Sequence, residues 1–236
     1  MNSTLPVPYL RADHVAAFAQ PLVPFEQKRD AVVYIQVSGF LLKLLPLVRS
    51  TEAKSLQSNC GALSKRDDVV RALMALNVSV EARGSCLNNA PRVPREQSKG
   101  DVMREYKFCI TMENSIAYDY ISEKVWDGLA AGCLPVYRGA PNAADHLPIP
   151  EAALLYDALG GTPEALAAEI RRLAHDREAY DSRFVWRTAP LAFLSPGYRR
   201  LVEDTRAEHS QCRLCKLVAA MRAHRARAYV RSTPVT

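Results

Sequence analysis

Charged and amide side chains gather directly after residues 107–112, an apolar run typical of a buried strand. Glu113, Asn114 and Ser115 follow this run, and Glu123 and Lys124 come shortly afterwards. A polar loop that leads from a strand into a helix offers backbone N–H donors and the positive end of the helix dipole to a phosphate or a sugar. In that setting Glu123 can accept hydrogen bonds from ribose hydroxyls and Lys124 can contact a diphosphate. A solvated Glu–Lys pair on a helix surface is the alternative when such residues stand alone.

The loop that follows residues 107–112 needs a strand before it and a helix after it, within an alternating order of strands and helices. The apolar periodicity predicts strands at residues 31–36, 78–83, 107–112, 134–137 and 154–156. Helices are predicted at residues 67–76 with Ser64 as a candidate cap, 120–131 ended by Gly132, and 163–175 with Pro163 in the first turn. This order predicts an α/β fold, a Rossmann-like parallel sheet with flanking helices. Ligands of such sheets bind at the carboxyl ends of the strands, here the loops at residues 59–66, 83–89, 113–119 and 138–142.

Bulk properties allow one sizeable α/β core. The chain has 236 residues, of which 48% are hydrophobic and 24% charged, as in ordinary globular proteins and unlike disordered or membrane-spanning ones. A net charge of +6 favours an anionic partner, either nucleotide phosphates, nucleic acid or an acidic membrane surface. No interleaved aromatic and basic residues or finger spacing supports nucleic acid. Residues 1–30, with four prolines, are predicted to be an extended linker or the remnant of a junction with another domain, and residues 31–205 the main domain.

Six cysteines and two Asn-x-Ser/Thr sequons, at Asn2 and Asn77, favour the secretory pathway. The alternative is that the sequons arise by chance and that Cys109 and Cys133 are buried thiols. No signal peptide is expected at the start of the sequence, so an anchor would have to lie upstream. The Cys212-x-x-Cys215 pair fits a redox motif, half of a zinc site or disulfide anchors, and its position late in the chain argues against a thioredoxin-like role.

Two segments do not fit the alternating pattern. Residues 37–57 form an apolar run interrupted by Lys43 and Pro46, which is predicted to be an insertion or an extra amphipathic helix. A membrane span and retained intron sequence are the alternatives, although the run is short for a span. Residues 206–236 hold the cysteine pair and a basic helix at residues 213–231, which would either lie on a membrane or pack as a solvated tail.

The polar loop and its flanks contain a longer pattern. Its parts are Tyr106-Lys107-Phe108, Glu113-Asn114-Ser115, Asp119-Tyr120, Glu123-Lys124, Pro135-Val136 and Gly139-Ala140-Pro141. At this spacing they resemble the signature of the α1,3/4-fucosyltransferases. Residues 58–66 (SNCGALSKR), 84–89 and 209–215 (HSQCRLC) further resemble the plant-type core α1,3-fucosyltransferases of N-glycans.

The resemblance implies an inverting transfer of L-fucose from GDP-fucose on a GT-B scaffold, of which this chain is the C-terminal, donor-binding half. Arg66 and Lys124 would stabilise charge on the departing diphosphate. Asn114 and Tyr120 would contact the donor, Glu123 its ribose, and Ser115, also in the donor-binding set, would shape the loop with Glu113. The resemblance implies no obligatory metal, with manganese at most stimulatory. It also implies that disulfides staple the Cys212–Cys215 segment to the body, and Cys60 and Cys86 are candidate mates in a pairing that the sequence leaves open.

The acceptor expected from this resemblance is an N-acetylglucosamine hydroxyl of an N-glycan core, linked α1,3. The resemblance also implies that the general base is a glutamate of the N-terminal acceptor domain, upstream of this chain. Asp13, His14 and Glu26 match no family motif, so no base is assigned here. The expected location is the Golgi lumen, as a type II membrane protein that meets the membrane only through an upstream anchor. The alternative is a truncated, inactive protein that binds a GDP-sugar.

Overall fold

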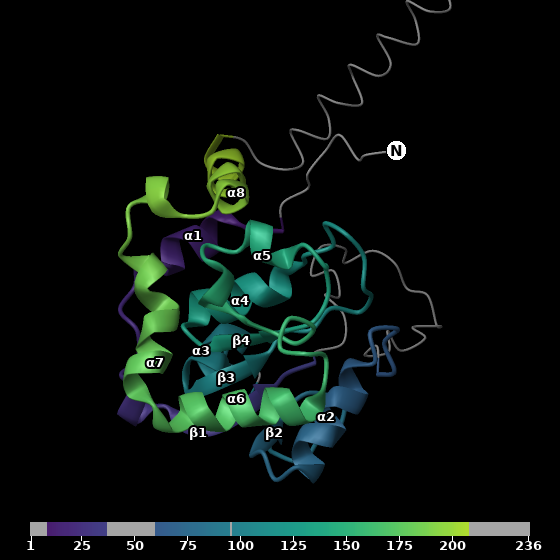
Figure 1. Cartoon of the computed structure of the whole chain (residues 1–236). Coiled ribbons are helices and arrows are strands. Elements are labelled where there is room, and N and C mark those ends of the chain that lie inside the picture. Colours follow the sequence, from purple (N-terminus) through teal and green to yellow (C-terminus); the bar gives the residue numbers. More distant parts are fainter. Residues whose placement is uncertain (1–8, 37–59, 95, 208–236) are drawn as a thin grey trace, which may run out of the picture.

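The computed structural model describes residues 9–36, 60–94 and 96–207. Within them, five parallel strands form one sheet in the order β2-β1-β3-β4-β5 (Figure 1). The strands are β1 (Arg29–Tyr34), β2 (Val80–Ala82), β3 (Tyr106–Ile110), β4 (Leu134–Tyr137) and β5 (Leu154–Leu155). β3 and β4 are buried throughout, which explains their nearly continuous apolar sequence.

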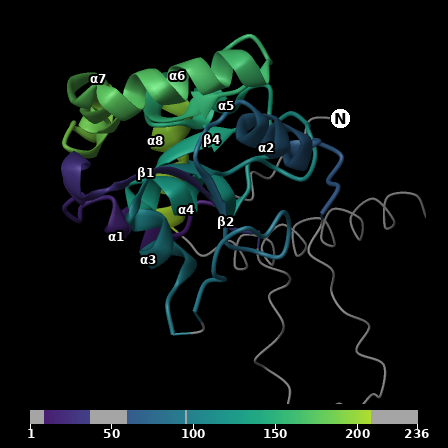
Figure 2. The same ribbon diagram turned by 90° about the horizontal axis from the view of Figure 1, so that it is seen from below.

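Helices cover both faces of the sheet (Figure 2). On one face lie α2 (Arg66–Ala75), α6 (Pro163–His175) and α7 (Arg177–Asp181), and on the other α1 (Ala12–Ala17), α3 (Lys99–Arg104) and α4 (Glu123–Ala131). Two more helices, α5 (Ala143–His146) and α8 (Pro196–Ala207), pack against each other. The short 3-10 helices are η1 (Phe25–Gln27), η2 (Pro150–Ala152), η3 (Ser182–Arg187) and η4 (Leu191–Phe193).

Alternate residues of the strands supply the two halves of the core. In β1, Val32 and Tyr34 join the cluster under α2 and α6, whereas Val33 joins the cluster that contains α3. In β3, Phe108 and Cys109 divide between the same two clusters. This two-residue alternation is the geometry of a strand buried on both sides, and it confirms the predicted α/β fold.

The strand order reverses between β1 and β3. The chain leaves β1 through α2 towards β2, at one side of β1, and leaves β3 through α4 towards β4, at the other side. In open parallel sheets, ligands bind in the crevice outside the carboxyl ends of the two strands at such a switch point. The fold therefore directs attention to the segments after Tyr34 and Ile110.

The predicted elements are present with shifted ends. Residues 134–137 and 163–175 match β4 and α6, and Gly132 ends α4 as predicted, with φ 69°. The helix predicted from residue 120 begins only at Glu123, because Asp119 has φ 61° and Ser122 occupies the N-cap.

Ser64 is not the cap of α2. Lys65 holds that position with φ 54°, and the Ser64 hydroxyl instead donates a hydrogen bond to the carbonyl oxygen of Glu113 at 2.5 Å. The segment predicted to be an extended linker contains α1 and η1, and α1 packs on α4 and α8. Because α1 buries His14 and neighbouring apolar residues, this part of the chain is not wholly extended.

Three predictions lie outside the described residues: the insertion at residues 37–57, the Cys212-x-x-Cys215 pair and the basic helix at residues 213–231. Among the helices that the structure does describe, none combines the length and apolar character needed to cross a membrane.

Candidate functional site

A cleft of about 880 Å³ opens at the switch point of the sheet. Tyr34, Ile35 and Gln36 line it from the end of β1, and Met112 lines it after β3. Charged or titratable residues of α4, of α1 and of α3 with their flanks also line it: Glu123, Lys124, Asp127, Arg11, Asp13, His14, Lys99, Asp101 and Arg104. The cleft thus combines the position expected for a ligand with charged groups of both signs set among apolar side chains.

Lys124 is the cation at the start of α4 in this cleft. Its Nζ donates hydrogen bonds to Glu113 Oε2 at 2.9 Å and to Ser122 Oγ at 2.5 Å, and its side chain is 15% exposed. Burial alone would lower the pKa of Lys124, but the charge of Glu113 and its hydrogen bond outweigh burial and raise it. The ammonium therefore stays charged at neutral pH.

Glu113 is the fully buried partner of Lys124. Besides the ammonium, it accepts hydrogen bonds from the backbone N–H of Ser122 at 2.6 Å and from the Ser122 hydroxyl at 2.7 Å. Its own N–H donates to the carbonyl oxygen of Arg138, after β4, at 2.8 Å. These contacts join both ends of the loop at residues 113–122 and fix where α4 begins.

Arg66 lies behind the cleft. It is the first residue of α2, is fully buried, and donates to the carbonyl oxygen of Met112 at 3.3 Å. The preceding turn is tied to the same loop, because the Ser64 N–H donates to the carbonyl oxygen of Asn114 at 3.0 Å. Arg66 and Lys124, which are distant in sequence, thus both contact the segment that follows β3.

The remaining predicted site residues lie along the loop and at the start of α4. Asn114, Ser115 and Tyr120 are partly buried, and Glu123 lines the cleft. Asn114 Oδ1 is buried and accepts no hydrogen bond from any described residue, which is the unmet capacity that a ligand donor would satisfy. Burial first, and then the charge of Glu113, raise the pKa of the Tyr120 phenol, so it stays protonated at neutral pH.

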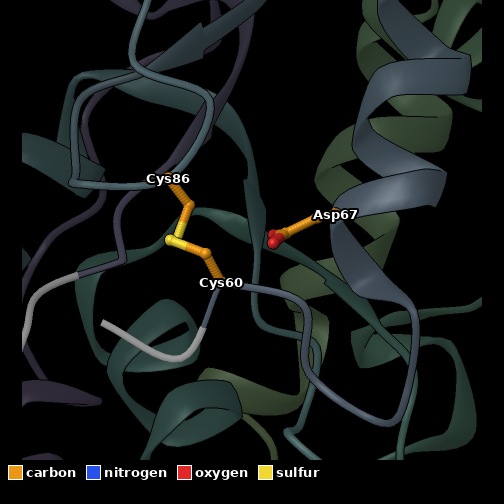
Figure 3. Close-up of side chains that lie close together, drawn as sticks. All are labelled: Cys60, Asp67 and Cys86. Carbon is orange, nitrogen blue, oxygen red and sulfur yellow. A yellow bond between two sulfur atoms is a disulfide. The ribbon is translucent and has the colours of Figure 1, made fainter. Parts of the chain in front are cut away.

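A disulfide between Cys60 and Cys86 ties the turn before α2 to the loop after β2 (Figure 3). Asp67 lies beside it and accepts hydrogen bonds from the Gly61 N–H at 2.9 Å and the Tyr34 hydroxyl at 2.6 Å. Cys60, Asp67 and Cys86 are also the group of metal-ligand types that the described residues bring within reach of one another. Since the two sulfurs are bonded to each other, neither offers a thiolate, and the group does not fit a metal.

This pairing corrects one expectation. Cys60 and Cys86 were candidate mates of Cys212 and Cys215, but they bond to each other, because the loops after β1 and β2 meet at the carboxyl edge of adjacent strands. Cys109 and Cys133 are free, buried thiols, as the alternative to a disulfide framework predicted.

Comparison with known proteins identifies the family. The family described as glycosyltransferase family 10 (fucosyltransferase) C-term matches residues 48–233, which is most of the chain. The chain belongs to glycosyltransferase family 10. This confirms that the pattern from Tyr106 to Pro141 marks a fucosyltransferase.

Curated relatives of this family 10 chain include GDP-fucose protein O-fucosyltransferase 3 from Rattus norvegicus, 32% identical over 94% of the chain and 46% of the relative. The protein of the same name from Bos taurus is 33% identical over 76% of the chain and 36% of the relative. The chain thus spans about half the length, or less, of the curated relatives it matches. Among solved structures, an α1,3-fucosyltransferase has a TM-score of 0.54 at 18% identity, over 74% of this chain and 42% of that one. The structure titled as α1,3-fucosyltransferase with GDP-fucose has a TM-score of 0.53 at 20% identity, over 69% and 40% of the two chains. These matches confirm the fold.

Arg138 is a charged residue that supports the loops of this family 10 chain and that the sequence analysis did not single out. It follows β4, donates to the carbonyl oxygen of Ser64 at 2.9 Å, and packs over the ring of Tyr156 with 4.9 Å from Cζ to the ring centroid. The only signal in the sequence was a basic residue directly before Gly139, inside the motif. The cleft residues of α1 were not assigned to the site because the start of the chain was interpreted as a linker, and those of α3 because no helix was predicted between residues 83 and 107.

Proposed function

We propose that this chain is the donor-binding part of a fucosyltransferase and that it holds GDP-fucose with the diphosphate at Lys124. The observation that carries the proposal is a charged, largely buried ammonium at a helix start, in the cleft at the switch point of the sheet. The domain that does this would span residues 31–205. Residues 1–30 and 206–236 would serve as a junction and a tail.

The chemistry of transfer fits this placement. When the bond between fucose C1 and the β-phosphate oxygen breaks, negative charge develops on GDP while the acceptor oxygen attacks the opposite face of C1. A preorganised cation near the diphosphate stabilises that charge. Lys124 supplies it from the cleft, and Arg66 would act from behind Met112. Asn114, Ser115 and Tyr120 would bind the donor, and Glu123 its ribose. We assign no general base and no metal within this chain.

For the acceptor, we propose an oxygen on a protein, because the curated relatives are protein O-fucosyltransferases by name. The second candidate is the N-glycan core with α1,3 linkage, which the motifs at residues 58–66 and 84–89 support. An assay with GDP-fucose and two acceptors, an unglycosylated folded protein and an N-glycopeptide, separates them. Transfer to the glycopeptide alone would overturn the first candidate. GDP binding without transfer to either would indicate an inactive GDP-sugar-binding chain.

We also propose that the protein works in the Golgi lumen, held by an anchor upstream of these residues. The Cys60–Cys86 disulfide supports an oxidising compartment. Imaging a tagged protein in cells beside a Golgi marker tests this, and a cytosolic distribution would contradict it.

Calorimetry of the chain with GDP, GDP-fucose and UDP tests the donor site. We expect both guanine nucleotides to bind, and Lys124→Ala to weaken GDP binding by about 30-fold, near 2 kcal/mol, the size of a hydrogen bond to a charged group. Arg177→Ala is the matched control, since it removes an exposed cation on α7. Thermal unfolding checks that each variant is folded. If no nucleotide binds, or Lys124→Ala binds as well as the parent, the assignment is wrong.

A further inference from the structure

We propose that Glu113 is a positioning residue that holds Lys124 both oriented and charged in the cleft, with Ser122 as the shared anchor. The proposal rests on the function proposed for Lys124 and adds a role for a residue that the donor need not touch. The geometry is a closed triangle: Lys124 Nζ donates to Glu113 Oε2 and to Ser122 Oγ, and Ser122 Oγ donates to the same Glu113 Oε2.

Because the Glu113 carboxylate is buried, it needs all of the contacts in this triangle. Glu113 has no exposed side-chain area, and a buried carboxylate is tolerated only with a counter-charge and hydrogen bonds to its oxygens. Ser122 supplies two neutral donors, and Lys124 supplies the charge. A shorter or neutral side chain at position 124 would leave the Glu113 carboxylate without a counter-charge. Burial of Glu113 therefore requires a long cationic side chain at position 124.

The same contacts determine where Lys124 can reach. An ammonium has three N–H donors, and Glu113 and Ser122 take two of them on the buried side. Within the part of the chain that the structure describes, its further ion pair is with Glu123 Oε1 at 3.5 Å, and that side chain is 41% exposed. The third N–H is therefore the one that an anion in the cleft could take, in competition with a partly exposed carboxylate. Glu113 thus aims the ammonium without blocking it.

Among the described residues, the titratable groups that affect the Lys124 ammonium are Glu113, Glu123 and Tyr120. Burial, the largest single influence, lowers the pKa of Lys124, and these groups together reverse that effect, with Glu113 contributing most. Without the charge of Glu113, burial favours the neutral amine. A lysine binds a diphosphate while it is protonated, so binding weakens as pH rises through the pKa, and a lowered pKa brings that loss to lower pH.

A purely structural role for Glu113 makes a different prediction. Glu113 also closes the loop through the Ser122 N–H, so its replacement could disturb the cleft whatever its effect on Lys124. Such a disturbance would weaken GDP binding by the same factor at every pH. The pH dependence of affinity therefore separates the two roles.

The test measures GDP affinity of the full 236-residue chain from about pH 7 to pH 9, the range in which a buried lysine that has lost its partner titrates. We expect Glu113→Gln to bind GDP about threefold more weakly than the parent at pH 7, with the ratio widening a further tenfold or so by pH 9, to about the loss expected for Lys124→Ala. The double variant Glu113→Gln/Lys124→Arg should show a constant ratio, because a guanidinium stays charged throughout. A constant ratio for Glu113→Gln itself would overturn the proposal.

A second measurement uses only the parent chain and so does not depend on whether a variant folds. Acetylation of the parent chain, followed by mass spectrometry, gives the labelling rate of Lys124 against pH. Only the neutral amine reacts, so the acetylation rate of a lysine rises about tenfold per pH unit until the pH reaches the pKa of that lysine. We expect the Lys124 rate to keep rising to about pH 10, and a plateau below that pH would overturn the proposal. This outcome is independent of GDP, so failure of the parent to bind GDP would count against the proposed function alone.

Discussion

Replacing both Cys60 and Cys86 with serine should lower the free energy of unfolding by about 3 kcal/mol, from the chain entropy that a cross-link of this span removes from the unfolded state. The bond joins residues 26 positions apart and encloses all of α2 and β2, so the unfolded chain gains considerable freedom without it. Urea unfolding of the double variant and the parent measures the difference.

The disulfide should also matter to the proposed donor site, because it fixes the turn that leads to Arg66 at the start of α2. We therefore expect the double variant to bind GDP more weakly than the parent. Reductant provides the control: it should bring the parent's unfolding midpoint towards that of the double variant. Equal midpoints for the oxidised parent and the double variant would show that this bond does not stabilise the protein through the unfolded chain.

Much of the fold could be predicted because its strands are buried on both faces. The apolar runs at residues 107–112 and 134–137 contain few polar residues to blur their ends, and Pro163 marks the start of α6. The ends of helices and strands were less predictable where a side chain forms a hydrogen bond with a residue that is distant in the sequence. Serine is a residue type favoured at helix N-caps, but the Ser64 hydroxyl donates a hydrogen bond to the carbonyl oxygen of Glu113, which is distant in the sequence.

Some residues of the candidate site could likewise be predicted from local motifs, whereas others depend on contacts between distant parts of the chain. Lys124 and Glu123 could be found because one motif contains the loop and the helix start. Arg138 could not, because its role depends on the carbonyl oxygen of Ser64, which only the sheet order brings near. The Cys60–Cys86 pairing was missed for the same reason, since it requires knowing that β1 and β2 are neighbours. Local patterns thus indicated which groups do chemistry, and the topology determined how they are supported.

Gly139→Ala should destabilise the protein by about 3 kcal/mol, as overpacking of a tightly filled site does, and should also weaken GDP binding. A Cβ at this position would lie 2.5 Å from the Tyr137 hydroxyl oxygen and 2.6 Å from Glu113 Cγ. Neither neighbour can easily move. The Tyr137 hydroxyl accepts from the Ala140 N–H and donates to the carbonyl oxygen of Tyr120, and Glu113 is held by three donors.

Gly100→Ala is the matched control, because it adds the same methyl group in α3 with only an ordinary contact, 3.7 Å from Ser98 Oγ. Alanine in a helix should stabilise by about 0.5–1 kcal/mol relative to glycine. Urea unfolding and GDP titration of both variants give the comparison. Parental stability and affinity in Gly139→Ala would mean that Glu113 can shift to make room. A carboxylate that shifts so easily could not hold the Lys124 ammonium in one direction, so this result would also remove the rigid support on which the positioning role of Glu113 depends.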